Sequence, residues 1–268
     1  MSSSQILLTN DDGIQSPGLW IAAKALSDIG FVNVVAPRDQ FSGAGRSLPI
    51  HSDGLIDQRE MEVNDQMWTV FAVGGTPAQA VLHAVLEIMP EKPILAVSGI
   101  NYGENLGTGI TVSGTVGAAL EAATRGIPAL AISLETKREY HLSYSPEVDF
   151  SAAGYFAAYF GRKLVEKELP SDVNVLKVDV PCDATPETPW EVTRLSRIIY
   201  YEPTPPIRDS WNQPGIPSYR IVGDPTKDSS DSDVYALRVK RVVSVTPLSL
   251  DMTSRIELQD FEHHLRRE

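Results

Sequence analysis

Two adjacent carboxylates, Asp11 and Asp12, follow the first apolar run of the chain, Ile6 to Leu8. The run predicts a buried strand that is broken at Gly13, so both carboxylates are expected at its C-terminal end. Neighbouring carboxylates repel each other unless a positive charge lies between them, and hard divalent cations such as Mg²⁺, Mn²⁺ and Ca²⁺ prefer oxygen ligands. The sequence Asn-Asp-Asp-Gly also favours a simple turn, and this segment alone does not separate a metal site from a turn.

Three further segments rich in Gly, Ser and Asn follow or lie close behind predicted strands. They are residues 36–45 with Ser42, residues 98–107 with Asn101 and Asn105, and residues 112–119 with Ser113, Gly114 and Thr115. In a parallel sheet such loops converge on one edge, where they add neutral oxygens and a helix N-terminus to the two carboxylates. This set could hold one Mg²⁺ and bind phosphate at the helix start, where backbone N–H groups favour an anion. The chemistry that fits is metal-assisted hydrolysis of a phosphate ester.

Each of these residues also has a purely structural interpretation. Ser42 could bond only to the backbone of its loop, and Ser113 could be no more than a helix N-cap. Asn101 and Asn105 could serve left-handed turns. The single cysteine, Cys182, is interpreted as inert, and the sequence has no CxxC or HExxH spacing. The coincidence of four polar loops of suitable chemistry favours the metal and phosphate interpretation.

The elements that must position these loops alternate between strands and helices. Strands are predicted at 6–8, 32–36, 67–73, 94–98 and 129–133, and helices at 18–26, from 76 onward, and at 113–125. The strands are apolar almost throughout, which indicates a mostly parallel sheet with helices on both faces. In such sheets ligands bind just outside the C-terminal ends of the strands.

The second half of the chain has another composition. A helix is predicted at 150–167 and a strand at 173–180. Residues 181–232 are rich in Pro, Ser, Asp and Thr, with short β-like runs at 192–195 and 197–201, and are interpreted as an extended β-rich excursion. Regular structure is expected again at 234–237 and 239–245, and the charged tail 253–268 could form a terminal helix. We therefore expect one domain over residues 1–268, with the site in residues 1–135.

Composition limits the classes of partner. The chain has 268 residues, 42% of them hydrophobic, and a formal net charge of −12. This acidity argues against binding of a nucleic-acid polymer, which usually needs a basic surface. Residues 1–5 lack the features of a signal peptide, and no apolar run approaches the about 20 residues of a membrane span. A cytoplasmic protein without membrane contact is the expectation.

Four sequence blocks resemble the SurE family of metal-dependent nucleotidases. They are Asn-Asp-Asp-Gly at 10–13, Ser-Gly-Ala at 42–44, residues 97–107, and Ser-Gly-Thr-Val-Gly-Ala at 113–118; residues 244–248 are similar to the closing strand motif of the family. The resemblance implies a Rossmann-like three-layer α/β/α fold and removal of phosphate from nucleoside 5′- and 3′-monophosphates, in some members also from short polyphosphate. It also implies one divalent ion per subunit, Mg²⁺ or Mn²⁺, and dimers or tetramers whose subunits exchange C-terminal elements.

The resemblance also assigns roles to individual residues. It implies metal ligation by Asp11, Asp12, Ser42 and Asn101, with the two aspartates also catalytic, and phosphate contacts from Asn105, Ser113, Gly114 and Thr115. The chain departs from the family pattern at residues 45–47, which read Gly-Arg-Ser where the family often has Ser-Asn-Ser. Arg46 is therefore a candidate substrate contact.

Other classes of function remain possible from the sequence. A non-catalytic nucleotide-binding regulator could retain the same pocket, although loss of one carboxylate would then be expected and both are present. Haloacid-dehalogenase phosphatases use Asp-x-Asp-Gly with a nucleophilic first Asp, and the corresponding position here is Asn10. A dinucleotide-binding enzyme is disfavoured because no GxGxxG follows the first strand.

Overall fold

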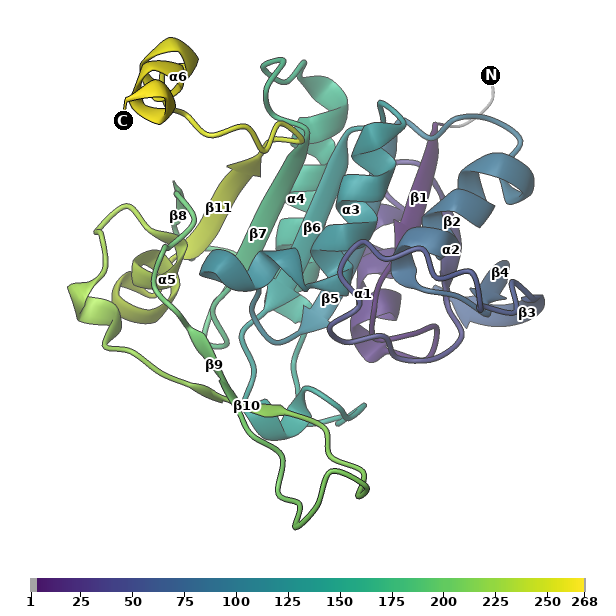
Figure 1. The fold of residues 1–268 in the computed structure, drawn as a ribbon. Coiled ribbons are helices and arrows are strands. Elements are labelled where there is room, and N and C mark those ends of the chain that lie inside the picture. Colours follow the sequence, from purple (N-terminus) through teal and green to yellow (C-terminus); the bar gives the residue numbers. More distant parts are fainter. Residues whose placement is uncertain (1–3, 268) are drawn as a thin grey trace.

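A nine-stranded, mostly parallel sheet with helices on both faces forms the centre of the computed structural model, which describes residues 4–267 (Figure 1). This architecture confirms the α/β fold predicted from the sequence. Residues 1–3, part of the N-terminal segment without signal-peptide features, and residue 268, part of the predicted tail, lie outside the described residues. No helix within the described range is long and apolar enough to cross a membrane.

The strands of the large sheet are β1 Gln5–Thr9, β2 Phe31–Pro37, β3 Ile56–Val63, β4 Gln66–Val73, β5 Leu95–Tyr102, β6 Ala129–Leu134, β7 Val175–Val180, β8 Trp190–Val192 and β11 Val243–Leu248. Their order is β3-β4-β2-β1-β5-β6-β7-β11-β8. The strands from β4 to β7 in this order are mutually parallel, whereas β3 pairs antiparallel with β4, and β11 with β7. Strands β9 Tyr201–Thr204 and β10 Ser218–Ile221 form a separate antiparallel hairpin.

The helices are α1 Pro17–Leu26, α2 Pro77–His83, α3 Gly114–Thr124, α4 Ser151–Glu166, α5 Asp233–Tyr235 and α6 Leu258–Arg266. Helices α1 and α4 pack together on one face of the sheet, and α2 and α3 on the other. Successive strand residues point to opposite faces. Leu8 accordingly belongs to the apolar core beneath α1 and α4, and Leu7 to the core beneath α2 and α3.

The order of the strands places a topological switch point at the centre of the sheet. Strand β1 pairs with β2 on one side and with β5 on the other, so the chain changes direction across the sheet at β1. Ligands of open α/β sheets bind at such a switch point, outside the carboxyl ends of the strands. Asp11 and Asp12 follow β1, and Asn101 lies near the end of β5.

Some elements differ from the sequence prediction. Strand β3 was not predicted, because its sequence Ile-Asp-Gln-Arg-Glu-Met-Glu-Val is polar and lies at the sheet edge; Asn64 and Asp65, both with positive φ, form its turn into β4. In the excursion β8 and β9 are shifted from the predicted runs 192–195 and 197–201, and β10 was not predicted. Segment 234–237 is helical, and the predicted run 239–245 becomes strand β11 only from Val243.

Candidate metal and phosphate site

The turn after β1 is held by Asn10 and Gly13, the residues on either side of the carboxylate pair. Asn10 Nδ2 donates to the carbonyl of Gly13 at 3.0 Å, and Asn10 Oδ1 accepts from the Gly13 N–H at 3.2 Å. Gly13 has a φ of +92°, which glycine adopts without strain. The turn chemistry therefore belongs to Asn10 and Gly13, and the two carboxylates between them are available for another role.

Asp11 faces the first turn of α3. Its carboxylate accepts a hydrogen bond from the Thr115 hydroxyl at 2.5 Å, and a Cβ placed on Gly114 would lie 2.8 Å from its Oδ2. The helix can approach this closely only because residue 114 is a glycine. Burial raises the pKa of Asp11, and hydrogen bonds from Thr115 and from the backbone of Gly114 lower it only in part. The N-terminus of α3 thus already contacts a protein anion.

Asp12 is also buried and is held by neutral donors. Its Oδ1 accepts from Gln40 Nε2 at 3.0 Å, and its Oδ2 accepts from the Tyr102 N–H at 3.0 Å. Burial raises the pKa of Asp12 well above its usual value, and the negative charge of Asp11 raises it further. No cationic side chain within residues 4–267 pairs with either carboxylate. A bound cation would remove this mutual repulsion.

The two neutral metal ligands implied by the resemblance lie next to residues that bond the pair. Ser42 follows Phe41, whose N–H donates to the Asp11 carbonyl at 2.7 Å, and Ser42 is exposed. Asn101 precedes Tyr102, and its Nδ2 donates to the Gly103 carbonyl at 2.7 Å. That bond uses the amide nitrogen and leaves Asn101 Oδ1 without a partner among the described residues. The lone pairs of this oxygen are therefore available to a cation. All four residues therefore offer oxygen atoms, the ligand type that a hard divalent cation prefers.

The remaining predicted contacts have other partners in this structure. Ser113 is the N-cap of α3, because its Oγ accepts from the Val116 N–H at 3.2 Å. Asn105 Nδ2 donates to Ser133 Oγ at 2.8 Å. Arg46 Nε lies 2.8 Å from a carboxylate oxygen of the buried Glu121. Arg46 therefore ties its loop to the middle of α3 instead of facing the carboxylate pair.

Three residues of the site surroundings were missed from the sequence. Gln40 orients Asp12, and the Tyr144 hydroxyl donates to the Asp12 carbonyl at 2.7 Å. Lys177 is fully buried, where it pairs with Asp179 and, at 3.1 Å, with Asp233. The position of Lys177 inside an apolar strand could have predicted a buried ion pair, since charged residues are almost never fully buried unless they are paired. Gln40 and Tyr144 carried no such signal.

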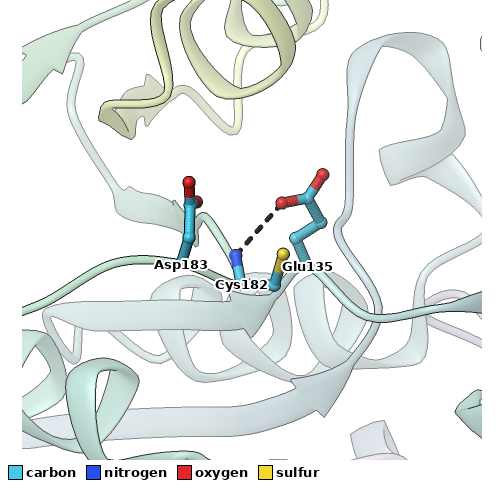
Figure 2. Close-up of side chains that lie close together, drawn as sticks. All are labelled: Glu135, Cys182 and Asp183. Carbon is cyan, nitrogen blue, oxygen red and sulfur yellow. Dashed lines mark hydrogen bonds between the residues drawn. The ribbon is translucent and has the colours of Figure 1, made fainter.

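A second acidic group lies away from this pair. Glu135, Cys182 and Asp183 offer potential ligand atoms within 4.8 Å of one another, and the Cys182 N–H donates to Glu135 (Figure 2). Arg241 pairs with both carboxylates, and Arg238 lies 3.0 Å from Glu135. Burial raises the pKa of Glu135, but the hydrogen bonds from Arg241 outweigh it and lower the pKa overall, whereas burial raises that of the Cys182 thiol. The guanidinium groups of Arg241 and Arg238 already neutralise these carboxylates. The cluster is therefore an ion-pair network.

The order of the strands and the position of the two carboxylates define the structural class of the protein. The chain is a doubly wound α/β protein whose candidate ligand site lies at the topological switch point. Within that class it belongs to the SurE family: the profile of the survival protein SurE family matches residues 6–202.

Individual relatives are similar to this chain over almost its whole length. The chain is 43% identical to the 5′-nucleotidase SurE of Thermococcus gammatolerans over 262 residues, which cover 97% of this chain and 96% of the relative. It is 44% identical to the 5′-nucleotidase SurE of Archaeoglobus fulgidus over 260 residues, covering 96% of both. The crystal structure of the SurE protein from Aquifex aeolicus matches with a TM-score of 0.75 and 31% identity, covering 97% of this chain and 99% of that one.

Proposed function

We propose that this chain is a metal-dependent 5′-nucleotidase that removes phosphate from nucleoside monophosphates. The observation that carries the proposal is the pair Asp11 and Asp12, two buried carboxylates without a cationic partner among the described residues, next to the N-terminus of α3. The relatives named 5′-nucleotidase SurE support the same activity. Activity on 3′-monophosphates and on short polyphosphate is part of the proposal as a secondary range of substrates.

The donor set selects the kind of ion. Asp11, Asp12, Ser42 and Asn101 would supply oxygen atoms only, with two negative charges, and this suits Mg²⁺ or Mn²⁺ better than softer metals. When bound, such an ion polarises a phosphoryl oxygen and lowers the pKa of a coordinated water. One ion per subunit is proposed, because the carboxylates converge at a single turn.

The protein groups around the ion have separate tasks in this proposal. Thr115 and Gln40 fix the orientation of the Asp11 and Asp12 carboxylates. The start of α3 at Ser113 favours the negative charge of the phosphate through its dipole. Asn105 Nδ2 has a second N–H beside the one that it donates to Ser133, and this N–H is proposed to donate to a phosphate oxygen. One carboxylate of the pair accepts the proton of the attacking water.

The activity is tested by measuring phosphate release from a panel of nucleoside 5′- and 3′-monophosphates with Mg²⁺, with Mn²⁺ and with a chelator. The Asp12→Asn variant should lose the metal-dependent release. Asp39→Asn is the matched control, because the Asp39 side chain is 71% exposed. No release from any nucleotide by a protein that demonstrably binds the metal would refute the enzyme and favour the non-catalytic regulator.

We also propose that the chain forms a homodimer or homotetramer through its C-terminal segment. Helix α6 stands apart from the sheet at the end of an extended segment (Figure 1). Leu258, Phe261 and Leu265 are 63%, 46% and 68% exposed, and they recur at helical spacing on one face. An apolar helix face without cover in its own subunit supports burial against a second copy of the chain.

A further inference from the structure

An aromatic segment borders the Asp12 side of the site. It lies between β6 and α4 and includes His141 and Tyr144. The Tyr144 hydroxyl donates to the Asp12 carbonyl at 2.7 Å. Gln40 Nε2 donates both to the Asp12 carboxylate, at 3.0 Å, and to the His141 carbonyl, at 2.9 Å. One side chain therefore joins this segment to the metal-binding carboxylate.

The His141 ring extends from there across the loop that follows Asn101. A Cβ placed on Gly103 would lie 2.7 Å from His141 Nε2, so the ring rests directly on this glycine. The Gly103 carbonyl in turn accepts the bond that orients Asn101. The ring thus lies within two residues of a proposed metal ligand.

The β9–β10 hairpin lies beside the same segment (Figure 1). Tyr219 of β10 shares a 2.7 Å hydrogen bond with His141 Nδ1. The Arg138 guanidinium lies over the Tyr219 ring, 5.0 Å from its centroid, and donates to Ser218 Oγ at 2.6 Å. Arg138 is exposed, so a flat guanidinium backed by an aromatic ring faces solvent.

We propose that Arg138, His141, Tyr144 and Tyr219, here named the aromatic rim, bind the nucleoside of the substrate. This inference rests on the proposed nucleotidase function and adds the part of the site that distinguishes a nucleotide from a sugar phosphate. Bases stack on aromatic rings and on arginine planes. Tyr144 is suited to this because its hydroxyl is fixed at Asp12 while 41% of the residue is exposed.

The chemistry of the rim also predicts how selective it is. Stacking tolerates every base, because each base has a π face, and discrimination among bases needs hydrogen bonds to their edges. The rim offers mainly flat surfaces. On the α3 side of the site, the Arg46 guanidinium is paired with Glu121 and is not available to bind the edge of a base. We therefore infer a preference for nucleotides over ribose 5-phosphate, with little preference among the bases.

A structural role is the competing explanation, since the His141–Tyr219 and Arg138–Ser218 bonds also hold the hairpin in place. The two explanations differ in the substrate that is affected. A loss of hairpin docking would impair hydrolysis of every substrate, whereas a loss of stacking impairs only substrates that carry a base. The comparison of a nucleoside 5′-monophosphate with ribose 5-phosphate separates them, because both present the same phosphate and sugar.

The test uses Arg138→Ala, Tyr144→Ala and Tyr144→Phe in the full chain. The alanine variants should raise KM for the nucleotide about tenfold and leave KM for ribose 5-phosphate unchanged. Tyr144→Phe keeps the ring and loses only the hydroxyl bond to Asp12, so its nucleotide KM should rise less than that of Tyr144→Ala. Tyr155→Ala on α4, where the native tyrosine is 43% exposed, and Arg59→Ala on β3 are the matched controls.

Equal losses for both substrates, or no loss for either, would overturn the role of the rim. If the wild-type protein hydrolyses neither substrate, the proposed function fails, and calorimetric binding of adenosine then tests the rim by itself. Weaker adenosine binding by Arg138→Ala than by Arg59→Ala would support the rim, and equal binding would refute it.

Discussion

The hydroxyl of Thr115 donates a hydrogen bond to the carboxylate of Asp11, although 104 positions separate the two residues. This bond places the first turn of α3 against the carboxylate pair at the end of β1. The positive end of the helix dipole therefore stabilises a protein anion before any substrate arrives. A phosphate bound here would share the helix terminus with Asp11, and a cation between them would relieve the repulsion.

Replacing Thr115 tests this relationship. Thr115→Val keeps the shape of the side chain and removes the hydroxyl donor, so the Asp11 carboxylate loses one of the hydrogen bonds that orient it. We expect Mg²⁺ or Mn²⁺ affinity to fall 10- to 100-fold, roughly the effect of losing a group that orients a metal ligand. Thr115→Ser should retain most of the affinity. Titration calorimetry measures it; an unchanged metal affinity with a raised KM for substrate would instead make Thr115 a phosphate contact.

Metal binding should also stabilise the fold, and Asp12 should be required for it. A ligand that binds only the native state at about 100 times its Kd adds about 2.7 kcal/mol to the free energy of unfolding. Saturating Mn²⁺ should therefore raise the Tm of the wild-type protein and leave that of Asp12→Asn unchanged. Asp39→Asn should respond like wild type. An equal rise of Tm in Asp12→Asn would place the ion elsewhere.

The stability of the metal-free protein should depend on pH through the buried pair Asp11 and Asp12. Burial raises the pKa of Asp12 in the folded state, so the folded state binds its proton more tightly than the unfolded state does. The stability from this group is present below the unfolded pKa of about 4 and is lost as pH rises through the folded pKa. As pH rises from about 4, urea unfolding should show wild type losing stability relative to Asp12→Asn. A constant difference between the two proteins would contradict a raised pKa.

The buried Lys177 should be essential to the loop that carries Asn105. Lys177 Nζ donates to the Asn105 carbonyl at 2.8 Å and pairs with Asp179 and Asp233. Lys177→Met leaves two buried carboxylates without a cation, which should cost about 3–5 kcal/mol of stability. Denaturant titration measures the loss.

Two further variants control for that result. Lys227→Met, at a side chain that is 83% exposed, should be neutral. Burial raises the pKa of Asp179 to about 6, even beside Lys177. Lys177→Met combined with Asp179→Asn should therefore recover part of the stability, because one of the unpaired charges is removed. No recovery would point to packing instead of charge.

The proposed oligomer depends on the apolar face of α6. Phe261→Glu together with Leu265→Glu should shift the protein to a smaller oligomer, because charges on an interface face cannot be buried without cost. Light scattering during size-exclusion chromatography measures the mass. His263→Glu, on the same helix, is the control and should leave the mass unchanged. A monomeric wild-type protein would refute the proposal.

Local sequence predicted much of the fold for physical reasons that particular elements illustrate. Strand β1 was predicted because Ile6 to Leu8 form an apolar run, and the start of α2 because Thr76 and Pro77 are typical of an N-cap and a first helical residue. The structure adds a capping box between Thr76 and Gln79. Strand β3 was not predicted, because a strand at the edge of a sheet does not require an apolar run. The boundaries in residues 181–232 shifted because pairing partners far away in the sequence, such as β11 for β8, define these strands.

The sequence by itself determined the carboxylate pair, the turn residues around it and the strand that delivers it, since burial and turn chemistry are local properties. The tertiary structure alone decided which groups meet the pair: Thr115 and Gln40 orient it, Tyr144 borders it, and Arg46 pairs with Glu121 instead. These contacts join residues up to 132 positions apart. They depend on how the loops converge at the switch point, and no local pattern of residues encodes that geometry.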